Sequence, residues 1–88
     1  MSAAQCAGRI LEAWNHADYN QFEAELERAA ARCRFDRPPS ILEDERRELL
    51  ESVVCNLRLL RTEEGDWQIQ RMKAPMDLLR HLVHAGAH

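Results

Sequence analysis

The sequence is short of glycine and serine, and this scarcity removes several classes of enzyme. The chain of 88 residues has only Gly8, Gly65 and Gly86, which stand far apart, so no glycine-rich loop for phosphate or a dinucleotide is formed. The few serines lie in no Gly-x-Ser-x-Gly sequence, and the His-Glu-x-x-His sequence of zinc proteases does not occur. We therefore expect a protein that is not an enzyme and that carries no cofactor.

Cysteine is also sparse, and long apolar runs are missing. The chain has three cysteines, an odd number, and no pair of them has Cys-x-x-Cys spacing. Both features argue against a disulfide framework and a zinc knuckle. The cysteines are Cys6, Cys33 and Cys55. Each cysteine lies among apolar neighbours, and we expect each to be a small buried side chain. No apolar run exceeds three residues, and residues 1–7 have neither the basic start nor the apolar core of a leader peptide, so none is expected. These features predict a cytoplasmic protein that does not contact a membrane.

Composition indicates one small folded domain over residues 1–88. Apolar residues make up 45% of the chain and charged residues 31%, a balance typical of globular proteins. A chain this short holds one domain and not two. The net charge is −3, whereas binding to nucleic acid phosphates usually calls for a basic domain, so a nucleic acid partner is not expected. The frequent Ala, Arg and Leu residues are typical of a GC-rich bacterial genome.

In the first part of the chain, apolar residues recur with the period of an α-helix and predict two helices. The first runs over 2–16, and the second starts at Asp18 and stops before Pro38, because the residue before a proline disfavours helical angles. Both begin with the spacing of a capping box. The short connection predicts an antiparallel helical hairpin. The apolar stripes are Ala3, Ala7, Ile10, Leu11 and Trp14, then Phe22, Leu26, Ala29, Ala30 and Cys33.

A third helix is predicted after the stiff loop that contains Pro38 and Pro39. Ser40 is placed to cap it, and Glu43 stands at the reciprocal position of a capping box. Glu43 and Arg47 also have the i, i+4 spacing of a favourable ion pair. Its apolar face is expected to consist of Leu42, Leu49, Leu50, Val53 and Leu57.

The segment over about 56–72 has two interpretations, a β-hairpin or two short helices. Apolar and polar residues alternate on both sides of residues 62–66, and Gly65 is placed to supply the positive φ of a type I turn with a bulge. The helical period can equally be continued through Leu60. Both interpretations place Trp67 and Ile69 in the core. The predicted fold class is therefore mainly α, or α+β if the hairpin forms.

A short C-terminal helix is predicted to begin near Pro75, a favoured first-turn residue, and to end at Gly86. Leu78, Leu79, Leu82 and Val83 should form its apolar side. On another side, His81 and His84 stand one turn apart and are candidate metal ligands. The alternative is a solvated face of an amphipathic helix. The full polar set is Asp77, His81, His84 and His88.

Two groups of charged residues are candidate sites, an acidic pair for catalysis and a basic cluster for binding. Glu23 and Glu27 stand one helical turn apart, and we expect a solvated face there, because acid–base catalysis needs a carboxyl group in a pocket. A set of basic residues gathers if the predicted hairpin packs beside the last helix, and an acidic protein or a nucleic acid could use it. These residues are Arg58, Arg61, Arg71, Lys73 and Arg80.

The sequence favours a small non-catalytic protein-interaction module: an accessory subunit, adaptor, chaperone or inhibitor of a larger assembly. A lone two-stranded hairpin is marginal in water and leaves open edges, which predicts a protein partner, self-association as a homodimer, or both. The alternatives are a metal- or ligand-binding sensor that uses the C-terminal histidines and a small DNA-binding regulator built on the first three helices. The expected partner-binding residues are Leu57, Leu59, Leu60, Trp67 and Ile69.

Overall fold

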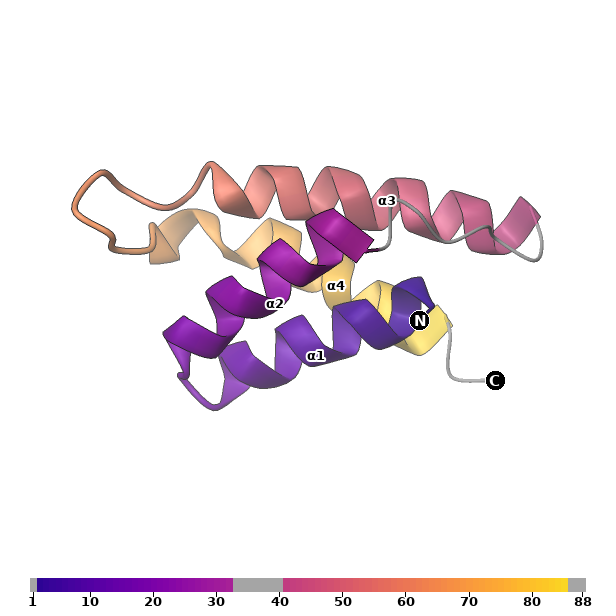
Figure 1. The fold of residues 1–88 in the computed structure, drawn as a ribbon, viewed down its shortest axis with the longest axis horizontal. Helices are drawn as coiled ribbons and strands as arrows, with labels where there is room; N and C mark the ends of the chain where they lie inside the picture. Colours follow the sequence, from indigo (N-terminus) through magenta and orange to yellow (C-terminus); the bar gives the residue numbers. More distant parts are fainter. Residues whose placement is uncertain (1, 33–40, 86–88) are drawn as a thin grey trace.

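The computed structural model describes residues 2–32 and 41–85, and four α-helices account for most of them (Figure 1). The helices are packed together, with no β-sheet in the described part of the chain. The predicted mainly helical fold is thereby confirmed. In chain order, the elements are α1 (Ala3–Asn15), α2 (Tyr19–Arg32), α3 (Ile41–Arg58), the 3-10 helix η1 (Ile69–Arg71) and α4 (Lys73–Ala85).

The start of α1 is the capping box that the sequence predicts. The Ser2 hydroxyl accepts a hydrogen bond from the Gln5 backbone N–H at 3.2 Å, and the Gln5 side-chain oxygen accepts one from the Ser2 N–H at 2.9 Å. Two backbone N–H groups that a helix start leaves without partners are thus satisfied.

The turn between α1 and α2 combines two helix caps. Ala17 has a φ of 56°, in the left-handed region. This conformation lets the Ala17 N–H donate to the Trp14 carbonyl at 3.0 Å and the Asp18 N–H donate to the Ala13 carbonyl at 3.1 Å. These are the two bonds of a Schellman motif. The Asp18 carboxylate then accepts a hydrogen bond from the Gln21 N–H at 3.1 Å and caps α2. The predicted helical hairpin is confirmed.

The core lies where α1 packs against the other three helices. Most predicted apolar positions are buried there, although Leu11, Trp14, Ala30, Leu49 and Val83 are only partly buried. Two expectations were wrong: Leu78 is 40% exposed and Cys55 is exposed, since each faces away from the other helices. The buried core residues are Ala3, Cys6, Ala7, Ile10, Ala13, Phe22, Leu26, Ala29, Leu50, Val53, Val54, Leu57, Leu60, Met72, Met76, Leu79 and Leu82.

The segment predicted as a hairpin contains the expected turn without two strands. The Gly65 N–H binds the Thr62 carbonyl at 3.0 Å, and Gly65 has a φ of 89°, so the turn and its glycine are as predicted. A single antiparallel bridge joins Arg61 and Trp67. The strands are not seen because helices occupy both sides of the turn. Before the turn, α3 continues through Arg58 and its Leu57 side chain is completely buried; after the turn, η1 begins at Ile69.

The last helix begins two residues earlier than expected. Pro75 lies in the first turn of α4, where its missing N–H leaves no helical bond unmade. Several predictions lie outside the described residues: the burial of Cys33, the capping of α3 by Ser40, and the end of α4 at Gly86. The side chains of Leu42 and Glu43 also lie outside the description.

Candidate functional site

A pocket of about 280 Å³ lies between the start of α2 and the segment that connects α3 to α4. We call it the Trp67 pocket. Two of its apolar residues are well exposed, Tyr19 at 46% and Ile69 at 55%. Its walls therefore combine aromatic and aliphatic surface with carboxylates and one guanidinium. The lining residues are Tyr19, Asn20, Glu23, Arg61, Gly65, Asp66, Trp67 and Ile69.

A row of aromatic rings connects this pocket to the core. The ring centroids lie 5.5 Å apart for Tyr19 and Trp14, 5.0 Å for Trp14 and Phe22, and 5.0 Å for Phe22 and Trp67. Phe22 is completely buried, and Trp67 meets it edge-on. Because aromatic pairs favour such tilted geometries, the row holds the partly exposed Trp67 against a fixed base.

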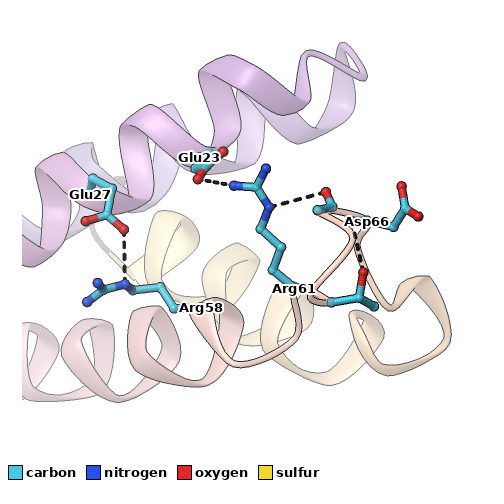
Figure 2. A network of polar contacts seen from close by, with 7 residues as sticks. Glu23, Glu27, Arg58, Arg61 and Asp66 are labelled. Carbon is cyan, nitrogen blue, oxygen red and sulfur yellow. Dashed lines mark hydrogen bonds and ion pairs between the residues drawn. The ribbon is translucent and has the colours of Figure 1, made fainter.

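Arg61 supports the pocket from the other side through three contacts, of which the two polar ones are drawn in Figure 2. Its guanidinium pairs with Glu23 of α2, and its Nε donates to the Gly65 carbonyl at 3.2 Å. The same guanidinium carbon lies 5.7 Å from the centre of the Trp67 ring, within the range of a cation–π contact. Arg61 thus joins the turn, the tryptophan and α2.

A second ion pair, Arg58 to Glu27 at 3.1 Å, runs beside the first (Figure 2). Two carboxylates one turn apart on α2 therefore meet two guanidiniums at the end of α3 and just beyond it. Glu23 and Glu27 remain about half exposed, in keeping with the predicted solvated face, and each also pairs with an arginine from outside α2. Both pairs are partly exposed, so each contributes less than about 1 kcal/mol to stability, and their role is to orient the segment against α2.

The predicted partner-binding residues divide between the core and the surface. Leu57 is fully buried and Leu60 is 8% exposed, so both belong to the core. Leu59 is 78% exposed. Trp67 is partly buried and lies with Ile69 in the pocket; the expectation that Ile69 is in the core was wrong, because η1 turns it outward.

Sequence reasoning missed the contribution of α2 to the pocket. Tyr19, Asn20 and Glu23 come from its first two turns. One signal in the sequence was available: Glu23 and Glu27 stand four residues apart, and Arg58 and Arg61 stand three apart, so each pair of like charges is separated by about one helical turn. The spacing alone does not show that these acidic residues pair with these arginines, because the pairing depends on how the helices pack.

The candidate metal ligands on α4 are both exposed. His81 and His84 lie on its outer side, and the nearby Asp77 carboxylate is paired with Arg80 at 2.8 Å. Residues 2–32 and 41–85 contain no group of three or more His, Cys, Asp or Glu side chains positioned for a metal ion. His88, the last member of the predicted set, lies outside the described residues.

A second cleft, of about 370 Å³, lies beside the turn between α1 and α2. Its buried group is Glu25, which is 7% exposed and accepts hydrogen bonds from Gln21 Nε2 at 2.7 Å and from Arg28 at 3.2 Å. Because this carboxylate already has partners, it stabilises the local structure. The cleft has a polar and mixed-charge lining without an exposed large apolar residue, so the Trp67 pocket is the better candidate for binding a protein.

The described helices include none with the length and apolar content needed to cross a membrane. Comparison of the chain with protein-family models, with curated proteins and with solved structures gives no match.

Proposed function

We propose that this protein is a small non-catalytic protein-interaction module and that it binds through the Trp67 pocket and the exposed residues around it. An accessory subunit, an adaptor, a chaperone and an inhibitor all act by such binding. The observation that carries the proposal is the presence of exposed Tyr19 and Ile69 beside a braced Trp67 in one pocket. Exposed apolar surface gathered in one place and rimmed by polar groups is typical of protein-binding sites.

The residue types in the pocket suit protein binding. Tyrosine, tryptophan and arginine are the residues that most often dominate the binding energy of protein interfaces, and Tyr19, Trp67 and Arg61 lie together here. Burying the exposed half of the Ile69 side chain adds about 1 kcal/mol, since complete burial of such a side chain contributes about 1.5–3 kcal/mol.

The pocket is also held in place before any partner arrives. Trp67 contacts Phe22 on one side and Arg61 on another, and Arg61 is itself held by Glu23 and Gly65. Ordering a side chain on binding costs about 0.5–1.5 kcal/mol, so a surface whose anchors are already ordered loses less free energy on association.

A cytoplasmic location is part of the proposal. Cys6 and Cys55 are both free thiols, one buried and one exposed. Free cysteines are typical of proteins kept in a reducing compartment, where disulfides rarely persist.

The test is capture of partners by tagged protein from its native cell, with two matched variants. Ile69→Asp places a charge in the pocket, and Leu78→Asp places the same charge on an exposed apolar residue of α4 that does not line the pocket. We expect wild type and Leu78→Asp to retain the same proteins and Ile69→Asp to lose them. Equal capture by both variants, or no capture by the wild type, would overturn the proposal; circular dichroism checks that each variant is folded.

A further inference from the structure

We propose that the surface around the Trp67 pocket binds a second copy of this chain, as a two-fold symmetric dimer in which the acidic turn of each copy faces the basic segment of the other. This inference rests on the proposed function and names the partner. It concerns the segment 59–73, which consists of the connection between α3 and α4 and the first residue of α4, at one end of the helices (Figure 1).

The charges along this segment are separated by sign. Glu63, Glu64 and Asp66 lie at the turn and are exposed, and Arg71 and Lys73 lie beyond it and are exposed as well. None of these five side chains forms an ion pair with another described residue. The segment therefore presents unpaired negative charge before Trp67 and Ile69 and unpaired positive charge after them.

This order makes the segment complementary to itself. A two-fold axis places the same patch of both copies in contact and reverses the direction of one against the other. With the axis near Ile69, Glu63 and Glu64 of one copy approach Arg71 and Lys73 of the second, and the same contacts form again on the other side of the axis. Opposite charges arranged in this way favour one partner and one register. A different protein would have to bring both sets of charges, whereas a second copy already has them.

The apolar residues lie where the centre of such a dimer would be. Ile69 is 55% exposed and Leu59 is 78% exposed. The Gln68 N–H donates a hydrogen bond to the Leu60 carbonyl at 2.9 Å and so closes the base of the turn. Leu59 directly precedes Leu60 and Ile69 directly follows Gln68, so both lie at this base. An apolar centre surrounded by charged residues is the usual arrangement of a protein interface.

This dimer does not depend on pairing between strands. The edge-to-edge pairing of two hairpins needs free strands on both copies, and the segment forms only one bridge, Arg61 to Trp67, within itself. The contacts proposed here are made by side chains. Because the charges are exposed, dissolved salt screens them over about 10 Å at 0.1 M ionic strength, and the dimer is expected to weaken as salt is added.

The experiment is sedimentation velocity of the full chain over a range of micromolar concentrations, with two charge-reversed variants. One variant carries Glu63→Lys and Glu64→Lys, and the other carries Arg71→Glu and Lys73→Glu. We expect wild type to approach twice the monomer mass of 10.2 kDa and each variant alone to show a Kd raised at least about tenfold, the equivalent of 1.4 kcal/mol. An equimolar mixture of the two variants should recover the dimer, since every reversed contact is then attractive again.

The control variant carries Glu45→Lys and Glu48→Lys on α3, which changes the net charge as the first variant does at exposed residues outside the segment. We expect its Kd to match that of wild type. Unfolding of the second variant is not expected, because glutamate near the start of α4 interacts favourably with the helix dipole, and circular dichroism verifies it.

A wild type that remains monomeric at every concentration overturns the inference, as does a mixture of variants that fails to recover the dimer. Association that is unchanged in both charge-reversed variants also overturns it, by placing the contact elsewhere. These results are distinct from failure of the proposed function: a monomer that still captures proteins through an intact Ile69 shows that the surface binds a different protein.

Discussion

Ala17 adopts a left-handed backbone conformation, and replacing it by glycine is expected to stabilise the fold. Its φ of 56° is required by the turn between α1 and α2, because only then can the Ala17 and Asp18 N–H groups reach the carbonyls of Trp14 and Ala13. Glycine is the residue most often found at this position of a Schellman motif, since it has no Cβ to clash in the left-handed region. Ala17 is exposed, so loss of its methyl group leaves no cavity.

Two opposing terms decide the magnitude. The left-handed conformation costs a residue with a Cβ about 1–2 kcal/mol. Glycine has more conformational freedom in the unfolded chain, which removes about 0.4–1 kcal/mol of the benefit. The net expectation for Ala17→Gly is a gain of about 0.5–1 kcal/mol in the free energy of unfolding, by the difference of these terms. For a domain of this size the gain corresponds to a rise in Tm of roughly 2–8 °C.

The assay is thermal unfolding followed by circular dichroism, at one protein concentration and in high salt so that association does not contribute to the Tm. Ala24→Gly is the matched control, because Ala24 is exposed within α2, where glycine is expected to cost about 1 kcal/mol. Opposite changes in Tm for the two variants support the reasoning. If Ala17→Gly melts at or below the wild-type temperature while Ala24→Gly is destabilised, the left-handed strain at Ala17 is not present.

Two further predictions concern the other turn and the cap of α2. Asp18→Ala removes the acceptor of the Gln21 N–H and should lower the free energy of unfolding by about 1 kcal/mol in urea titrations. Asp18→Asn keeps a side-chain oxygen and should retain most of this stability. An equal loss in both variants would point to a role for the charge. Gly65→Ala should cost about 1–2 kcal/mol because of the φ of 89°, with Gly65→Asn intermediate. An unchanged urea midpoint for Gly65→Ala would show that the turn adopts another conformation in solution.

Features that depend on neighbouring residues were predictable from the sequence. The capping box of Ser2 and Gln5, the cap of Asp18 on Gln21, and the turn around Gly65 each depend on hydrogen bonds between residues at most four positions apart. Such bonds form wherever the local chain permits them. The positions and types of these elements were therefore correct.

Errors arose where the outcome depends on distant helices. Leu78 has the same helical periodicity as buried Leu79 and Leu82 but faces outward, and Met72 and Met76 take the inward positions instead. The two interpretations of residues 56–60, strand or helix, could not be separated by local pattern; α3 continues through Arg58, with Leu57 buried against the other helices. Intrinsic propensity is a weak guide when tertiary packing opposes it.

By itself, the sequence determined the helical hairpin, the caps and the turn at Gly65, because periodicity and short-range hydrogen bonds specify them. Only the tertiary structure decided the Trp67 pocket. Its walls come from α2 and from the segment after α3, which are far apart in the chain. They meet because α2 and α3 pack side by side around the core, and that packing brings Glu23 to Arg61 and Phe22 to Trp67.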